Sequence, residues 1–465
     1  MGSVTVRTAS GAPLRRSLGL RDLVVYGLLF IAPMAPVGIF GVLDAKSHGA
    51  VAAVYLAATA AMGLTAFSYA QMVRAVPQTG SVFAYARAGL GEAAGFTAGW
   101  MAMLDYLLIP AVAYLFSGIA LHALVPGVSR WAWTVLAVLL TTALNLAGVR
   151  TAAVVGFAVL AMELAVLAVF VAAAVVQLAR HGAVRPALSP LTGIGAGGHG
   201  GSSIGAVLGA VSVAVLSYLG FDAIASFVEE AVGASAAVAR ALAICLVLAG
   251  VLFVAQTYLA ALLEPLTPAE LAARPEAQGS AFYDTVEGSV GHWLHTLVAA
   301  SKAIGAAFAA LAGQAAAGRL LFAMGRQGRL PRQLALVDPD SGVPRRALLL
   351  AALVTLGAAG WAAARSNGLD QLTSVVDIGA LTAFVLLHAS VIGWYAVRNR
   401  SRDRLRHVLL PVVGIAVLVA VIWRASHAAQ LAGALWLLVG LAVLWLQGAG
   451  PVAPGRPGGA VRRRR

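Results

Sequence analysis

Three carboxylic acids fall inside long apolar stretches of this sequence, where a charge is costly. They are Asp105, Glu163 and Asp222. An ionised carboxylate at the centre of a bilayer costs on the order of 3 kcal/mol or more, so each acid needs a cation, a proton or another acid as its partner. We expect Asp105 and Asp222 to bind the ammonium group of a substrate. We expect Glu163 to carry a coupling proton, although it can equally be a neutral, hydrogen-bonded structural residue.

Two helix-breaking patterns lie in the same apolar stretches. The first is IAPMAPVG at 31–38, and the second is SYLGFD at 217–222. Proline removes a backbone donor and disrupts the preceding turn, while Gly220 permits unwinding. Unpaired backbone groups are tolerated in hydrocarbon only where protein encloses them. Paired breaks at corresponding positions of two inverted halves mark the central site of a secondary transporter. A single proline kink, by contrast, is common in membrane helices and does not indicate a function.

The breaks, the acids beside them and the adjacent aromatic rings form the predicted binding site, because aromatic faces attract ammonium groups. The predicted substrate-binding residues are Ala32, Pro33, Met34, Ala35, Pro36, Gly38, Asp105, Tyr106, Tyr218, Gly220, Phe221 and Asp222. Three acids near the ends of their spans are predicted to act in gating, namely Glu229, Glu230 and Asp377. His292 and His295 stand three residues apart at a helix start, but they lack a third ligand, so we expect no metal site.

The composition places these elements in a membrane. Of the 465 residues, 60% are hydrophobic and only 11% are charged, whereas a soluble domain carries about a quarter charged residues. The single cysteine, Cys245, cannot form an internal disulfide. The net charge of +14 comes largely from loops on one side of the predicted spans, which orients both ends of the chain toward the cytoplasm. Because no folded basic domain is present, we expect no nucleic-acid partner.

Twelve apolar segments could each cross a hydrocarbon core of about 30 Å as a helix. They run over 22–43, 50–72, 93–121, 132–148, 153–178, 206–232, 237–262, 292–325, 346–364, 371–396, 407–424 and 430–448. Such unbroken runs exclude a β-barrel. Each interrupted span is the first of a set of five spans. Because five crossings leave the chain on the opposite side of the membrane, the second set must be inverted relative to the first. We therefore predict an all-α polytopic membrane protein with a LeuT-like inverted repeat of five plus five helices, broken in helices 1 and 6.

This plan divides the chain into five parts. A cytoplasmic N-terminal segment covers 1–21, the first repeat 22–178 and the inverted repeat 206–396. Two accessory helices follow at 407–448, and a basic cytoplasmic tail covers 449–465.

The sequence also resembles a known family over nearly its whole length. PQTGSVFAY at 77–85, NLAGVR at 145–150 and GRLLFAMGRQGRLP at 318–331 are similar to patterns of the amino acid–polyamine–organocation permeases. The stretch at 104–110 and the proline-rich break look similar to the putrescine-importing branch. The resemblance implies a secondary transporter. Many carriers of this family have a glycine-rich first break whose amides hold a substrate carboxylate, and the prolines here leave fewer such donors.

We therefore expect a transporter of the plasma membrane that imports a small organic cation, with putrescine first, by alternating access. An amino acid permease or an amino acid/amine exchanger is the alternative within transport. An ion channel would favour a pore loop or a charged ring, and a membrane enzyme would need a convergent catalytic set. Neither is found. No cofactor is expected, so a gradient of protons or of another ion, sodium included, must drive transport. In the lipid bilayer the protein would be a monomer or a homodimer.

Overall fold

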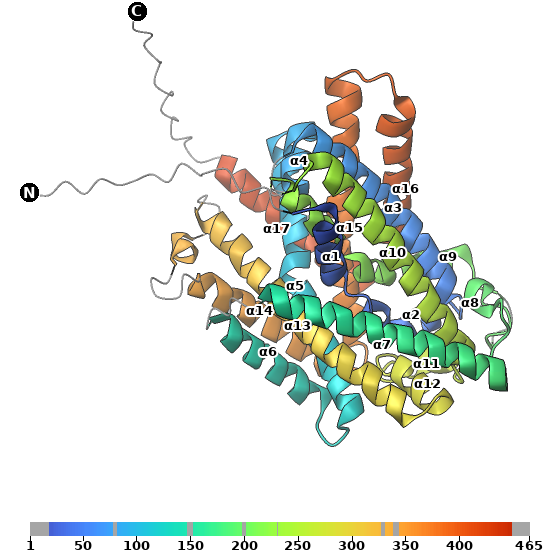
Figure 1. Cartoon of the computed structure of the whole chain (residues 1–465). Helices are drawn as coiled ribbons and strands as arrows, with labels where there is room; N and C mark the ends of the chain where they lie inside the picture. The colour runs from blue at the N-terminus through green and yellow to red at the C-terminus, as the bar shows by residue number, and fades with distance from the viewer. Residues whose placement is uncertain are drawn as a thin grey trace, which may run out of the picture.

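The computed structural model describes residues 18–77, 81–146, 152–197, 201–229, 231–326, 331–337 and 344–448. These residues are helical apart from turns, loops and one isolated bridge between Leu18 and Ala231. The helices gather into one bundle, in which segments from both halves of the chain alternate (Figure 1). An all-α polytopic membrane protein, the fold class expected from the composition, is confirmed.

The helices follow the apolar segments of the sequence closely. In chain order they are α1 (Leu20–Ile31), η1 (Ala35–Gly38), α2 (Phe40–Lys46), α3 (Val51–Ala75), α4 (Ser81–Leu90), α5 (Glu92–Leu124), α6 (Arg130–Leu146), α7 (Ala152–His181), α8 (Ser189–Thr192), α9 (Ile204–Ala214), η2 (Val215–Tyr218), η3 (Phe221–Glu229), α10 (Ala234–Leu263), α11 (Pro268–Ala273), α12 (Ala281–Ser289), α13 (His292–Arg326), η4 (Arg332–Ala335), α14 (Arg345–Ala363), α15 (Gly368–Val391), η5 (Ile392–Arg398), η6 (Leu405–Leu409), α16 (Leu410–Arg424) and α17 (His427–Gly448).

Ten of these helical segments, within the described ranges, are long and apolar enough to cross a bilayer. The fourth and sixth predicted spans correspond to shorter apolar helices, at Arg130–Leu146 and Ile204–Tyr218. A crossing of about 30 Å takes roughly 20 helical residues. By length, the described residues thus contain ten candidate spans rather than the expected twelve.

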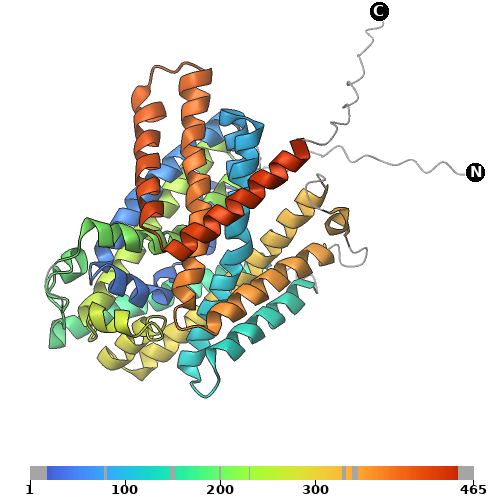
Figure 2. The ribbon, with the colours of Figure 1, turned by 180° about the vertical axis from the view of Figure 1, so that it is seen from behind.

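The long helix α5 lies in the middle of the bundle and packs against α13, α15, α4 and α6. Its own residues are apolar on all sides, as is usual for a buried helix. Figure 2, which views the molecule from behind, shows α17 crossing in front of the other helices. Stacked indoles fix α17 to α5, since Nε1 of Trp100 donates to the carbonyl of Trp436 and Nε1 of Trp436 donates to that of Trp100, each at 2.8 Å. The two last helices, α16 and α17, are otherwise the most exposed of the candidate spans.

Both predicted breaks are present. Helix α1 ends at Ile31, and the chain passes through η1 before α2 resumes. After η2, Leu219 and Gly220 separate the two halves of the other broken segment. The amide of Val232 donates to the carbonyl of Leu18 at 2.8 Å, so the chain just before α1 meets the chain just after η3. The two interrupted elements therefore run beside each other.

Candidate substrate and coupling site

The first break takes its shape from two prolines. Pro33 and Pro36 have no amide hydrogen to continue α1, and Ala32 adopts a φ of 57°, which is rare for a residue with a side chain. Carbonyl groups released here find partners on other helices. Gln256 Nε2 of α10 donates to the carbonyl of Pro33 at 3.0 Å, and Lys302 Nζ of α13 donates to that of Met34 at 3.0 Å. The break is therefore held open by side chains, as enclosed backbone in a membrane requires.

The second break touches the first through Gly220. Its φ is 103°, a conformation that favours glycine. A Cβ atom at this position would lie 2.9 Å from the carbonyl oxygen of Phe30, at the end of α1. Only glycine lets the two backbones approach this closely. The breaks consequently form one continuous irregular region within the bundle.

Asp222 stands two residues after this glycine and is 8% exposed. Its carboxylate accepts hydrogen bonds from the backbone of Gly220 and of Asp222 itself, and a long one of 3.4 Å from the hydroxyl of Tyr69. These bonds can stabilise a carboxylate at the start of a helix without any ligand. Asp222 can therefore serve both to shape the break and to present negative charge.

Two further acids lie near Asp222. Asp105 of α5 interacts electrostatically with Asp222, and Asp377 of α15 with Asp105. The helices α15 and α5 come close at Gly379, whose Cβ would lie 2.8 Å from the carbonyl of Met101. Oδ1 of Asp105 and both carboxylate oxygens of Asp377 are buried without a hydrogen-bond partner among the described residues. Asp377 is fully buried in the interior of α15, and its predicted role in gating stays a prediction.

Glu163 of α7 lies against α13, the helix that also carries Lys302. It is 3% exposed, and a Cβ on Gly305, one turn along α13 from Lys302, would collide with its Oε1. The two side chains interact electrostatically. The Lys302 ammonium also lies 4.9 Å from the centre of the Phe116 ring, against which Gly38 packs. Lys302 thus points inward, with Glu163, the ring and the carbonyl of Met34 around it.

The backbone amides of the first break mostly bond to nearby carbonyl groups, so the chain there forms a series of tight turns. Met34, Pro33, Pro36 and Gly38 are buried, whereas Ala32 and Ala35 are half-buried. The amide of Ala32 donates to Leu28, that of Ala35 to Ala32 and that of Val37 to Met34. Few amides therefore remain to hold a substrate carboxylate, as expected from the prolines.

The three predicted aromatic residues take different places. Tyr106 is half-buried and interacts electrostatically with both Asp222 and Asp105. Phe221 packs edge-on against Tyr69 at 5.7 Å. The hydroxyl of Tyr218 instead pairs with that of Thr59 on α3 at 2.6 Å, and its ring packs on α10. Of the three, Tyr106 is the residue that the structure brings to the acids.

The other predicted gating residues give no side-chain geometry. The backbone of Glu229 ends η3, but its side chain lies outside the described residues, as does Glu230 entirely. Two residues that were not among the predicted site residues contact the first break. Gln256 and Lys302 support the first break, and a polar side chain within an apolar helix was the signal that could have identified both.

Comparison with known proteins identifies the family of this chain. A family model described as amino acid permease matches residues 23–456. The low-affinity putrescine importer PlaP of Escherichia coli strain K12 is 27% identical over 454 residues, which cover 95% of each chain. The branched-chain amino acid permease BcaP of Bacillus subtilis is 26% identical over 94% of each chain, and the methylthioribose transporter of the same organism is 28% identical over 93% of each.

The fold and the matches define a class, that of polytopic membrane transporters. Within it, the chain belongs to the amino acid permease family, because the family model covers nearly all of it. It is accordingly a transporter and not an enzyme. The relatives in this family are named for different substrates, so membership of the family does not identify the substrate of this chain.

Proposed function

We propose that this protein imports a small organic cation, with a diamine such as putrescine first, by proton-coupled alternating access. The observation that carries the proposal is the group of three acids, Asp105, Asp222 and Asp377, around the second break. None of the three forms an ion pair with a lysine or arginine of the described residues. Uncompensated carboxylates in a membrane need a cation. A diamine brings two ammonium groups to such a site, and the ring of Tyr106 offers one of them a cation–π surface.

The first break supports an amine over an α-amino acid. Carriers of α-amino acids need donors for the substrate carboxylate, and the amides of Ala32, Ala35 and Val37 already bond within the turn. The name of PlaP, a putrescine importer, points in the same direction. An amino acid permease or exchanger is the second candidate, favoured by the permease BcaP. It would require the backbone of the breaks to rearrange when substrate binds.

Glu163 and Lys302 supply a route for proton coupling. Their side chains interact electrostatically, and Lys302 also donates to the carbonyl of Met34. A proton taken up by this pair would change the attraction between α7 and α13 and the hold of Lys302 on the break. Binding of the proton and movement of the broken helix would thus depend on each other. No cofactor is involved in this scheme, and the proton gradient provides the driving force.

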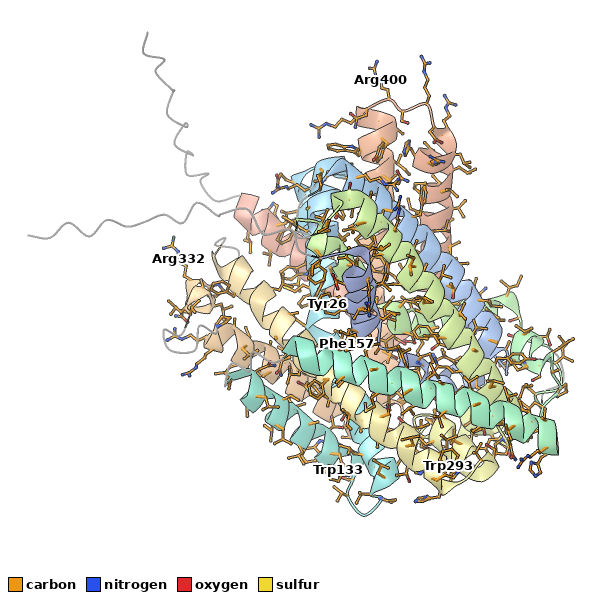
Figure 3. All side chains as sticks on the ribbon, in the orientation of Figure 1. Tyr26, Trp133, Phe157, Trp293, Arg332 and Arg400 are labelled. Atoms are coloured by element: carbon orange, nitrogen blue, oxygen red, sulfur yellow. The ribbon has the colours of Figure 1, made fainter. Side chains whose placement is uncertain are left out.

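The proposed architecture has twelve crossings of the plasma membrane, with Arg130–Leu146 and Ile204–Tyr218 continued across by their neighbouring segments. The first five form one repeat, at 22–178, and the next five its inverted counterpart, at 206–396, as in LeuT-like transporters. Helices α16 and α17 would be accessory, which their exposure supports. Both termini would lie in the cytoplasm, because basic loops favour that side. Figure 3 shows Arg332 and Arg400 far from Trp133 and Trp293, which lie at the opposite end.

Uptake into proteoliposomes tests the proposal. Labelled putrescine should accumulate against its gradient when the lumen is alkaline, and unlabelled diamines should compete better than monoamines or amino acids. Asp222→Asn should reduce uptake at least about tenfold, since one well-placed charged hydrogen bond is worth about 1.5–3 kcal/mol. Asp403→Asn is the matched control, because Asp403 is an exposed acid whose carboxylate pairs with Arg406 nearby.

Three results would contradict the proposal. Better competition by neutral amino acids than by diamines would show that the substrate is an amino acid and not a diamine. Unchanged accumulation after the pH gradient is collapsed would remove proton coupling. Normal uptake by Asp222→Asn would remove Asp222 from the site.

A further inference from the structure

The corner between α12 and α13 brings three metal-ligating side chains together, far from the substrate site. Glu287 lies in α12, and His292 and His295 begin α13 beyond Gly291, where a φ of 128° turns the chain. Nδ1 of His292 lies 3.0 Å from Oε1 of Glu287, and Nδ1 of His295 lies 3.8 Å from Oε2. The ligand atoms of all three residues lie within 4.8 Å of one another. Glu287 is the third ligand that the sequence pattern of two histidines lacked.

His295 is the member that hydrogen bonding within the protein does not explain. The residue is 3% exposed, and its Nδ1 has no hydrogen-bond partner among the described residues. The ring of Tyr283 packs against it edge-on at 6.3 Å, which fixes the imidazole. Buried polar atoms are nearly always paired. This nitrogen is directed at the Glu287 carboxylate from a distance too long for a hydrogen bond, so a bound ion between them would satisfy it.

The distances suit a small transition-metal ion. Zn²⁺ binds histidine nitrogen and carboxylate oxygen at about 2.0–2.2 Å. In a tetrahedral site such ligands stand about 3.4 Å from one another, a value between the two distances from Glu287. Two imidazoles and one carboxylate favour Zn²⁺ over Ca²⁺ or Mg²⁺, which prefer oxygen ligands.

The corner also has access and room for a further ligand. It borders a cavity of about 560 Å³ that Glu287 and His295 line together with Asp284, Glu276 and His122. Asp284 interacts electrostatically with His295 and Glu287, and its carboxylate accepts a hydrogen bond of 2.8 Å from Ser280 Oγ. Either this carboxylate or a water molecule could complete the coordination.

We propose that Glu287, His292 and His295 form a Zn²⁺-binding site at the corner between α12 and α13. Trp293, the neighbour of His292, marks this end of the bundle in Figure 3, opposite Arg400. The ion would join α12 to α13. Because Phe282 of α12 packs edge-on against Phe40 of α2 at 5.7 Å, the ion would also fix the segment that covers the second half of the first broken helix. The site does not depend on which substrate is carried.

Titration with Zn²⁺ alone tests the site. The full-length, tag-free protein in detergent is stripped with EDTA, freed of the chelator and titrated in competition with a zinc indicator. The parent should bind one equivalent. Glu287→Gln and His292→Asn should each weaken binding at least about tenfold, since even outer-shell changes cost 10–100-fold. Both side chains are largely exposed, so these variants keep the fold. His181→Asn, which changes an exposed histidine at the end of α7, is the matched control.

The thermal midpoint gives a second measurement. Zn²⁺ should raise it in the parent and in His181→Asn, but not in a variant that combines Glu287→Gln with His292→Asn. Equal zinc affinity of the parent and the double variant would overturn the proposal. So would a parent that binds no Zn²⁺ at micromolar concentration, because a buried histidine and two further ligands would then not make a site.

Discussion

At the scale of single residues, Lys302 connects more of the site than any acid does. Its ammonium donates to the carbonyl of Met34 and faces Glu163 and the ring of Phe116, while the side chain is 2% exposed. A buried charge is stable only while its partners remain. Lys302 thus ties the broken helix, α7 and α13 into one electrostatic unit.

We predict that Lys302→Met strongly destabilises the protein. The change removes the cation that interacts electrostatically with Glu163 and the donor that satisfies the Met34 carbonyl, and a buried acceptor left unsatisfied costs about 1–3 kcal/mol. Cys245, the only cysteine, is fully buried. The midpoint can therefore be measured on heating with a dye that fluoresces when it reacts with the exposed thiol.

The double variant Glu163→Gln/Lys302→Met controls this experiment. If the two side chains interact, removing both charges should cost less than the sum of the single changes, with a coupling energy of about 0.5–3 kcal/mol. Strictly additive effects would mean that Lys302 acts only through the Met34 carbonyl and that Glu163 is an independent structural residue.

At the scale of elements, the contact between the two broken segments decides whether they can unwind together. We predict that Gly220→Ala reduces transport. An alanine would have to adopt a φ of 103° and place its Cβ 2.9 Å from the carbonyl oxygen of Phe30. Such backbone strain costs about 1–3 kcal/mol, and relief of the strain would push α1 away from η3. Putrescine uptake and the thermal midpoint should both fall.

Gly357→Ala is the matched control for this substitution. Gly357 lies within α14, and a Cβ there would meet nothing within 4 Å. Alanine favours a helix over glycine by about 1 kcal/mol, so this variant should be as stable as the parent or more so. Equal activity of Gly220→Ala and Gly357→Ala would show that the contact between the breaks is unimportant for transport.

The sequence predicted the breaks because their cause is local. Pro33, Pro36 and Gly220 disturb a helix wherever they stand in it, and the structure shows both interruptions at these residues. The side chain of Lys302 could not be oriented in the same way. Its helix, α13, is rich in alanine and glycine on all sides, so no apolar stripe distinguishes an inner from an outer face. Whether a lysine there reaches the lipid surface or a partner depends on tertiary packing.

At the scale of the whole molecule, packing also determined the places of Asp377 and Tyr218. Asp377 joins Asp105 because Gly379 lets α15 approach α5 closely. Tyr218 turns to Thr59 because α3 lies behind it. A sequence gives the depth of a residue along its helix but not the neighbour it faces. The apolar runs predicted the helices well, because a helix forms from its own local sequence. The number of crossings stays open, because α6 and α9 are shorter than the other candidate spans.

The bundle is closed at one end by a buried ion pair, which is the last feature we propose to test. Arg185, just after α7, donates from Nη1 and Nη2 to the two carboxylate oxygens of Asp44 at 2.9 and 2.8 Å. Nη2 of Arg185 also donates to the carbonyl of Leu266. The exposed fractions of the Arg185 and Asp44 side chains are 5% and 0%. The pair joins the end of α2 to the loops after α7 and α10, which are far apart in the sequence.

We predict that Arg185→Met lowers the thermal midpoint, measured by the reaction of Cys245, by an amount equivalent to about 3–5 kcal/mol, because Asp44 would keep a buried charge without a partner. Adding Asp44→Asn should restore part of that loss, since the second change removes the isolated charge. Arg180→Met, which changes an exposed arginine in the last turn of α7, should leave the midpoint nearly unchanged. Equal midpoints for Arg185→Met and Arg180→Met would show that the ion pair does not hold this end of the molecule together. A loss confined to Arg185→Met, with partial recovery in the double variant, would show that charge anchors the end of α2 there.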